Sequence, residues 1–387
     1  MPAPVPATPS APLRDARGER LLARVDLAAI ERNVRRMAEQ VGPAEVMAVV
    51  KADGYGHGLV PSATAAQAGG ASWLGVARLG EALALREAGV TGPVLQILVS
   101  PDDDLVAARD HLVDITVGTP DVLAAAGRAA RPGQPLRVHL EFDSGMGRGG
   151  SAGTQWLRLL DETAEQERRG HVRCVGVFSH LAAAEDDPAM VDDQTGRFRA
   201  ALDDVARAGL SPVVRHLANS AGTLARPRTH FDLVRPGLAV FGISPDDALG
   251  DEQSLGLRPA MTLSCRVATS KRVPAGHAVS YGPDHVTGRE TTLAVLAAGY
   301  ADGIPRFAGN RGHVLLRGRR RPIVGRVCMD QLVVDLGDDA VETGDQAVLF
   351  GPGEAGEPTL REWAAWCGTI PNEVLARLGA GVRHVYV

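Results

Sequence analysis

Lys51 is one of only two lysines in the chain, the other being Lys271, although the sequence contains 41 basic residues. It follows the apolar run EVMAVV at 45–50, which predicts a buried strand with the lysine at its carboxyl end. Burial lowers the pKa of a lysine and leaves more of it as the neutral amine, the nucleophile that reaction with an aldehyde cofactor requires. The alternative is an ordinary surface lysine at a strand end.

The segment KADGYGHG at 51–58 supports the chemical interpretation of this lysine. Its glycines allow the backbone to approach a ligand closely, and the hydroxyl of Tyr55 can donate a hydrogen bond to an anion. A covalently held, negatively charged cofactor fits these features.

A second group of polar side chains lies around the predicted strand at 137–142. His139, Glu141 and Asp143 alternate with apolar residues, so they point to one side of the strand. In a barrel that side is the interior, where a carboxylate needs a cationic partner.

These residues need a scaffold of strands and helices to position them. From about residue 22, β-branched runs alternate with amphipathic stretches, which predicts βα units and a parallel sheet. The expected strands lie at 22–26, 46–51, 73–76, 94–98, 114–117, 137–142, 174–178, 213–217 and 233–234. Eight or nine such repeats fit an α/β fold of the (β/α)8 TIM-barrel type.

After about residue 242, closely spaced strand and turn patterns predict a mostly β domain with one helical stretch at 359–366. We therefore expect a disordered Pro/Ala-rich tail at 1–19, a barrel at 20–256 and a β-rich C-terminal domain at 257–387.

Composition excludes several classes of partner. A net charge of −5 gives no general attraction to nucleic acid or to anionic lipid. The N-terminus has neither the basic start nor the apolar core of a signal peptide, and no apolar run is long enough to span a membrane. The four cysteines show no metal-binding spacing, so we expect no metal and reduced thiols in a cytoplasmic protein.

Seven segments in the same order resemble the motifs of alanine racemases, which are fold-type III enzymes. They are KADGYGHG at 51–58, GMGR at 145–148, HLANS at 216–220, VRPG at 234–237, VSYG at 279–282, GYADG at 299–303 and VCMD at 327–330. The resemblance covers almost the whole chain after the tail and implies a pyridoxal 5'-phosphate (PLP) cofactor, a barrel followed by a β domain, and interconversion of L-alanine and D-alanine that supplies peptidoglycan synthesis.

A racemase removes a proton from one face of the α-carbon and returns one to the other, so two bases are needed. The resemblance implies Lys51 as one base and Tyr281, from the partner subunit of a homodimer, as the other. A phenol is a weak base unless nearby groups stabilise its phenolate, and His180 and Arg235 are the candidates. Alternatively, Tyr281 would be a core residue, His180 a structural histidine and Arg235 part of an ion pair at a strand end.

The resemblance also implies the cofactor contacts. Arg235 would face the pyridine nitrogen of the cofactor. Its charge would leave that nitrogen unprotonated and so weaken the ring as an electron sink. The phosphate would meet Ser220, Tyr55 and the backbone amides of Gly237 and Leu238. His216, at the end of the strand that precedes Ser220, would lie under the ring or beside Arg235, or alternatively be structural.

Arg148 resembles the family arginine that contacts the cofactor and the substrate carboxylate. Glu141 stands where the family often has a carbamylated lysine, so we expect no such modification and an ion pair between Glu141 and Arg148. The alternative for Glu141 is an interior charge unrelated to Arg148.

Asn372 is, like Glu141, a departure from the family pattern, because it stands where the family commonly has a tyrosine that narrows the substrate pocket. The smaller amide leaves room for a larger or hydroxylated substrate such as serine. Met329 and Asp330 resemble the family residues that the partner subunit places near the substrate carboxylate and the entrance. Arg306 stands where the family has an entry-channel arginine, and each of the three could equally be structural.

Three other functions are possible. A broad-specificity amino-acid racemase is favoured by Asn372. A decarboxylase of the same barrel class would present an acidic residue, not Arg235, to the pyridine nitrogen, and a PLP-binding homeostasis protein would lack the domain that carries Tyr281.

Overall fold

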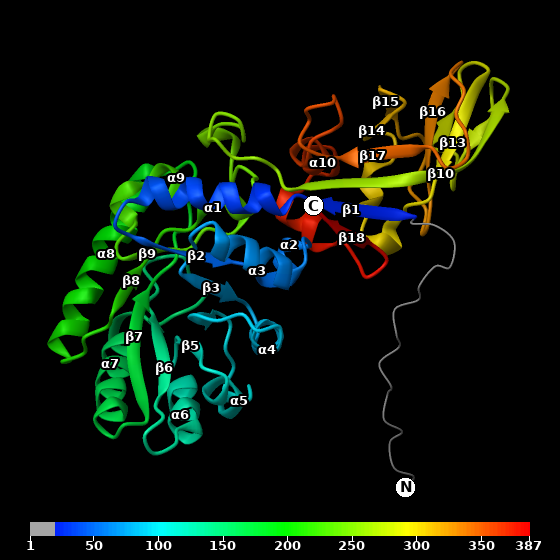
Figure 1. Cartoon of the computed structure of the whole chain (residues 1–387). Coiled ribbons are helices and arrows are strands. Elements are labelled where there is room, and N and C mark those ends of the chain that lie inside the picture. Colours follow the sequence, from blue (N-terminus) through cyan, green and yellow to red (C-terminus); the bar gives the residue numbers. More distant parts are fainter. Residues whose placement is uncertain (1–19) are drawn as a thin grey trace, which may run out of the picture. The chain divides into compact units, whose positions relative to one another are not determined.

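The computed structural model describes residues 20–387, and the predicted tail at 1–19 lies outside them. The described chain divides into two compact units. The barrel unit comprises Asp26–Ala260 with the last two residues, Tyr386–Val387. The C-terminal unit comprises the described residues up to Val25 together with Met261–Val385. Figure 1 labels the elements of both units.

Eight parallel strands close into a barrel, which confirms the predicted fold class. Each strand pairs with the next along the chain, and β9 pairs with β2 to close the ring. The strands are β2 (Glu45–Val49), β3 (Trp73–Val76), β4 (Val94–Gln96), β5 (Val113–Val117), β6 (Leu136–Glu141), β7 (Val172–Phe178), β8 (Val214–His216) and β9 (Leu233–Val234).

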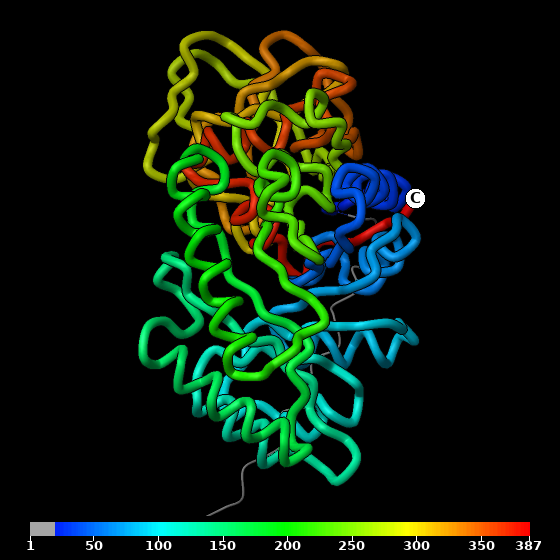
Figure 2. Tube along the Cα trace, turned by 90° about the vertical axis from the view of Figure 1, so that its left-hand side faces the viewer, coloured from blue at the N-terminus to red at the C-terminus, as the bar shows by residue number. Residues whose placement is uncertain are grey.

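Helices and short turns connect the barrel strands, and the alternation can be followed in the cyan and green part of Figure 2. The helices are α1 (Leu27–Val41), α2 (Lys51–Tyr55), α3 (Leu59–Ala68), α4 (Leu79–Glu87), α5 (Leu105–Asp110), α6 (Pro120–Ala129), α7 (Gly153–Arg168), α8 (Pro188–Arg207) and α9 (Ser220–Ala225). The 3-10 turns η1 (Pro227–Thr229), η2 (Leu238–Phe241) and η3 (Asp247–Leu249) follow.

Side-chain caps begin several of these helices. The Asp26 carboxylate accepts the N–H of Ala29 at the start of α1, and Thr119 caps α6 in front of Pro120. Such caps satisfy N–H groups that have no partner within the helix, each contributing about 1 kcal/mol.

Apolar side chains fill part of the barrel interior. One buried cluster takes a residue from each of six strands: Met47, Trp73, Leu95, Val175, Val214 and Leu233. A filled interior excludes water, so polar side chains in the barrel must find protein partners.

The prediction that residues 22–26 form the first barrel strand was wrong. This strand, β1 (Leu21–Val25), pairs antiparallel with β10 (Met261–Val273) in the C-terminal unit, with Leu21 opposite Cys265. Its burial alternates along the strand, as in a sheet with one covered face, whereas β2 is buried from its second residue onward. Because β9 closes the ring on β2, the barrel has no free edge for β1.

The C-terminal unit is mostly β, as predicted. Its main sheet has the order β15-β14-β17-β10-β1-β18, and β13 and β16 extend from β10. The remaining strands are β11 (Ala278–Val279), β12 (His285–Val286), β13 (Thr291–Leu296), β14 (His313–Leu316), β15 (Arg319–Pro322), β16 (Leu332–Gly337), β17 (Gln346–Phe350) and β18 (Arg383–Tyr386). The helical elements are η4 (Tyr300–Asp302), η5 (Arg306–Ala308), α10 (Leu360–Cys367) and α11 (Pro371–Ala376).

The final residue returns to the barrel unit, where the N–H of Leu27 donates to the carbonyl of Val387 at 3.0 Å. Figure 2 shows the C-terminus beside the start of α1. All four cysteines are free thiols. Between residues 20 and 387, no helix is long and apolar enough to cross a membrane.

Candidate active site

Lys51 begins a turn of unusual backbone geometry just after β2. Ala52, Asp53, Gly54 and Tyr55 all have positive φ angles between 51° and 63°. A left-handed conformation costs about 1–2 kcal/mol for each residue with a side chain, so this turn is strained. Hydrogen bonds hold it: Glu81 accepts the N–H of Ala52 at 2.7 Å, and Asp53 accepts the N–H of Leu59 at 2.7 Å.

Lys51 is half-buried at the carboxyl end of its strand, where TIM-barrel enzymes place their active sites. Burial lowers the pKa of its ammonium, the positive charge of Arg148 lowers it further, and Glu81 opposes the change. Its environment is thus not that of a freely solvated surface lysine.

Arg235 is 5% exposed and donates to several acceptors at once. It reaches the carbonyl of Ser179 at 2.8 Å, Nδ1 of His180 at 3.2 Å and Nδ1 of His216 at 3.1 Å. Its guanidinium also lies 5.0 Å from the centre of the Phe178 ring. Burial lowers the pKa of Arg235 to about 10, so it remains a cation at neutral pH.

Both histidines beside Arg235 are neutral. Burial lowers the pKa of His180 and of His216 well below the usual value, and the charge of Arg235 adds to the effect. An arginine can only donate, so each histidine accepts through Nδ1 and carries its proton on Nε2. His180 therefore offers a neutral N–H donor rather than a second cation.

A small polar cradle lies where the chain turns from β9 into η2. The hydroxyl of Ser220 accepts the N–H of Gly237 at 3.0 Å, and that glycine has room for no side chain because a Cβ would overlap the Tyr55 hydroxyl. Tyr55 packs against Phe241 at 5.2 Å, and burial raises its pKa to about 12. Leu238 begins η2, so its N–H has no acceptor within that turn. The sequence-predicted phosphate contacts thus lie together.

The expected ion pair between Glu141 and Arg148 is absent from the described residues, which corrects that expectation. Glu141 lies against Gly149 and Gly118, where a Cβ on either would touch its carboxylate, and Arg148 is exposed on the following loop. A glutamate is shorter than a carbamylated lysine, so its charge stops before the arginine. Burial raises the pKa of Glu141, while the charges of Arg235 and Arg148 oppose that rise.

Of the alternating polar set on β6, His139 is fully buried, whereas Asp143 organises the next loop. The Asp143 carboxylate accepts the N–H groups of Gly145, Met146 and Gly147 at 2.9 to 3.2 Å. Asp143 thereby fixes the GMGR segment that carries Arg148.

Three motif segments meet in the C-terminal unit. Tyr300 and Ala301 donate their N–H groups to the carbonyls of Cys328 and Met329, and Ser280 donates its hydroxyl to the carbonyl of Arg326 at 2.7 Å. Ser280 has a φ of 65°, and Tyr281 next to it is 73% exposed in the single chain.

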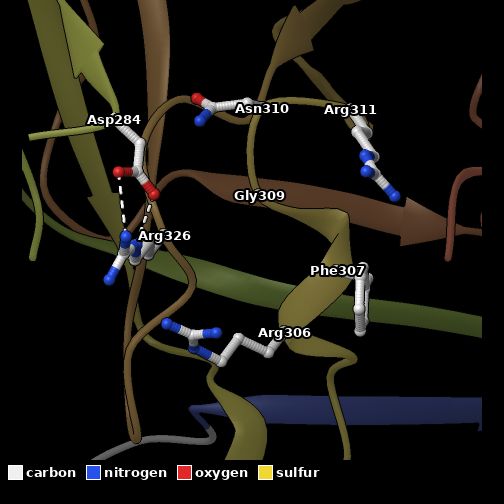
Figure 3. A pocket seen from close by; sticks show the side chains of 7 residues that line it. All are labelled: Asp284, Arg306, Phe307, Gly309, Asn310, Arg311 and Arg326. Atoms are coloured by element: carbon white, nitrogen blue, oxygen red, sulfur yellow. Dashed lines mark hydrogen bonds and ion pairs between the residues drawn. The ribbon is translucent and has the colours of Figure 1, made fainter. Parts of the chain in front are cut away.

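A polar hollow of about 460 Å³ lies beside these segments (Figure 3). Its lining comprises Asp284, Arg306, Phe307, Gly309, Asn310, Arg311 and Arg326. Arg326 pairs with Asp284 through two hydrogen bonds, and Arg311 lies 5.5 Å from the Phe307 ring. The lining carries the three arginines Arg306, Arg311 and Arg326 against the single carboxylate of Asp284, so the hollow is positively charged.

Two further positions predicted from the sequence lie in this unit. Asp330 is exposed after Met329, and Asn372 is half-buried in the first turn of α11 after Pro371. No group of three or more metal-binding side chains occurs within residues 20–387.

The model of the alanine racemase N-terminal domain matches residues 25–245, and that of the alanine racemase C-terminal domain matches residues 260–386. The chain belongs to the alanine racemase family. It is 52% identical to the alanine racemase of Frankia casuarinae, over 94% of this chain and 95% of that protein, and 50% identical to that of Thermobifida fusca, over 94% and 97%.

Solved structures of alanine racemases have the same fold. The structure of the enzyme from D-cycloserine-producing Streptomyces lavendulae matches with a TM-score of 0.93 at 45% identity, covering 96% of this chain and 98% of that one. The alanine racemase of Bacillus anthracis with bound L-Ala-P matches with a TM-score of 0.89 at 34% identity, covering 96% of both chains.

The alanine racemase motifs led to most of these residues, but Glu81, Asp114 and Ser280 were missed. A usable signal existed for Asp114, since it alternates with Thr116 on β5 as the polar residues do on β6. Glu81 is the third residue of α4, an acidic position that commonly caps a helix. Nothing in the sequence marks Ser280 as a residue with positive φ.

Proposed function

We propose that this protein is a PLP-dependent alanine racemase that interconverts L-alanine and D-alanine with two bases, Lys51 and Tyr281. The observation that carries the proposal is the half-buried Lys51 at a barrel strand end, with a lowered pKa, in a chain from the alanine racemase family. The family resemblance further implies that the enzyme is cytoplasmic and that its product, D-alanine, supplies peptidoglycan synthesis.

The residues present fit the cofactor. Ser220, Tyr55, Gly237 and the free N–H of Leu238 form a cradle for the phosphate, and the missing Cβ at Gly237 leaves the approach open. Arg235, held by four acceptors of the protein, would meet the pyridine nitrogen. When bound, PLP supplies an aldehyde that takes up the substrate amino group and a ring that delocalises negative charge from the α-carbon.

Lys51 and Tyr281 would move the proton. The neutral amine of Lys51 accepts the α-proton on one face, and the phenol of Tyr281 delivers a proton on the other; the roles reverse in the opposite direction. Arg235 and the Nε2–H of His180 would stabilise the phenolate.

The two bases are proposed to come from different subunits. Tyr281 is exposed in the single chain, and Arg306 lies in the positively charged hollow near it, suited to guiding a substrate carboxylate inward. Arg148 would bind that carboxylate, assisted by the partner subunit's Met329 and Asp330. Glu141 would hold Arg148 by charge at a distance instead of by direct contact.

The experiment follows the α-proton. L-alanine is incubated in deuterated water with wild-type protein and with Tyr281→Phe, and both chirality and α-deuterium are measured. We expect wild type to form D-alanine, and Tyr281→Phe to lose at least about 100-fold in rate while retaining the cofactor. Lys51→Ala should lose the covalently held cofactor, whereas Lys271→Ala, the matched control at an exposed position of β10, should retain it.

Wild-type protein that binds PLP but racemises no amino acid would refute the proposal and favour a homeostasis protein. A broad-specificity racemase is the second candidate, because Asn372 leaves a smaller side chain where the family commonly has tyrosine. Turnover of L-serine at a rate similar to that of L-alanine would favour it.

A further inference from the structure

A continuous chain of buried polar side chains leads from Arg235 into the barrel interior. Arg235 lies 3.1 Å from Nδ1 of His216, and Nε2 of His216 lies 2.9 Å from Nδ1 of His139. Nε2 of His139 lies 3.3 Å from the carboxylate of Asp114, which also receives two hydrogen bonds from Arg137. We propose that His216, His139 and Asp114 form a directed hydrogen-bond relay that positions Arg235.

The two ends of the chain determine its direction. A guanidinium can only donate, so His216 accepts at Nδ1 and must carry its proton at Nε2. That proton is donated to Nδ1 of His139, whose own proton is then on Nε2 and points to Asp114. An ionised carboxylate can only accept, so every link in the relay has one donor and one acceptor.

The charges of the relay agree with this direction. Burial opposes ionisation of Asp114, but hydrogen bonds from His139 and Arg137 lower the pKa of its carboxyl below the usual value. A protonated His139 or His216 would point hydrogen at hydrogen within the relay. Both imidazoles are therefore neutral, and the charges are confined to Arg235 at one end and the Asp114–Arg137 pair at the other.

The packing around the relay is shaped to let it cross the barrel. His139 on β6 reaches His216 on β8 past the intervening strand β7, and the residue of β7 opposite His139 is Gly176. A Cβ at Gly176 would overlap Nδ1 of His139, the atom that accepts from His216. Aromatic rings hold both imidazoles: Trp73 lies edge-on to His139 at 5.4 Å, and Phe178 stacks on His216 at 4.9 Å.

This geometry gives the relay a role in the proposed reaction, and that role rests on the proposed function. His216 and His180 take two of the Arg235 donors, so the guanidinium has a fixed orientation and a full positive charge. Residues that touch neither substrate nor cofactor, such as His139 and Asp114, thus become positioning residues for the group that would face the pyridine nitrogen.

The first test is independent of activity. Holoenzyme labelled with 15N in its histidine rings is studied by NMR, and His139 and His216 are assigned from single variants. We expect both rings to be neutral with a protonated Nε2 and a bare Nδ1. A protonated Nδ1 on either ring, or an imidazolium, would overturn the relay.

The second test asks whether the relay positions Arg235. Gly176→Ala and Asp114→Leu should each lower kcat by roughly tenfold with KM little changed, the size of effect expected when one charge-assisted hydrogen bond is lost. Asp114→Asn keeps an acceptor oxygen and should restore most of the activity and the Nε2–H form of His139. Gly196→Ala, on α8 where a Cβ meets nothing, is the matched control.

The two proposals can fail separately. The expected tautomers in a protein without racemase activity would leave the relay standing and refute the proposed function. Full kcat in folded Asp114→Leu protein, with the His216 tautomer changed, would show that the relay exists but does not position Arg235, and would refute that role.

Discussion

The N–H of Ala52 donates to the carboxylate of Glu81 at 2.7 Å, directly beside Lys51. The other oxygen of the same carboxylate accepts the N–H groups of Ala77 and Arg78 at 2.8 and 3.1 Å. Glu81 therefore ties the strained turn after β2 to the start of α4. This bond, together with the one that the N–H of Gly56 donates to the carbonyl of Ala52 at 3.0 Å, offsets the cost of the left-handed conformation of Ala52.

We predict that Glu81→Ala lowers both kcat and the affinity for PLP by about tenfold, because loss of the hydrogen bonds costs about 1–3 kcal/mol of local stability. Glu81→Gln retains an acceptor for Ala52 but loses the charge that raises the pKa of Lys51, so an intermediate effect is expected. Steady-state kinetics and cofactor titration measure this. Glu87→Ala, at the exposed end of the same helix, is the control, and equal behaviour of the two alanine variants would contradict the prediction.

The cradle gives a second prediction. Gly237→Ala should weaken PLP binding by at least about tenfold, because the new Cβ overlaps the Tyr55 hydroxyl and forces that buried ring to move. Titration of the apoenzyme with PLP, followed by absorbance, measures the affinity. Adding Tyr55→Phe to this variant removes the overlapping oxygen and should recover part of the lost affinity. If Gly237→Ala binds PLP as wild type does, the cradle is not the phosphate site.

The barrel was predictable from the sequence because buried parallel strands read as short apolar runs separated by amphipathic helices. β1 was not, since the run LLARV fits either a barrel strand or an antiparallel sheet, and only the closure of β9 on β2 excludes the first. Local pattern cannot reveal which distant edge a strand will join.

Single residues could be proposed for the site from the sequence, Lys51 and Tyr55 from their own chemistry and Arg235 from the resemblance to alanine racemases, and their roles stay predictions. Contacts that require two side chains to meet were not predictable. The Glu141–Arg148 ion pair failed on side-chain length, and the His139–Asp114 contact depends on the stagger between β5 and β6. Partner choice across strands is set by three-dimensional register, which a single sequence does not state.

Buried neutral histidines predict how stability depends on pH. In the folded protein the pKa of His180 lies well below 6.5, chiefly through burial, whereas in the unfolded chain it is about 6.5. Below that pH the unfolded state binds a proton that the folded state excludes. The free energy of unfolding should therefore fall with decreasing pH, by at most about 1.4 kcal/mol per pH unit for this one group, and be flat above about pH 7.

Melting temperatures of wild type and His180→Asn between pH 5 and 8 measure this dependence. The variant should start less stable at pH 8 and show a shallower loss towards pH 5, because one of the buried groups that resist protonation has been removed. His216 contributes in the same direction and keeps some slope in the variant. Parallel curves for the two proteins would mean that His180 takes up its proton equally in both states.

Asn372 gives the last prediction, which concerns specificity. Asn372→Tyr should restore the bulk that the family commonly has at this position and lower kcat/KM for L-serine more than for L-alanine. A pocket that gains or loses space for one small group changes discrimination by about 10-fold to 200-fold. The ratio of the two kcat/KM values, compared between wild type and variant, is the measurement, and Asn372→Gln serves as a control that retains the amide. If the ratio is unchanged in Asn372→Tyr, this side chain does not line the substrate pocket, and the case for a broad substrate range loses its structural basis.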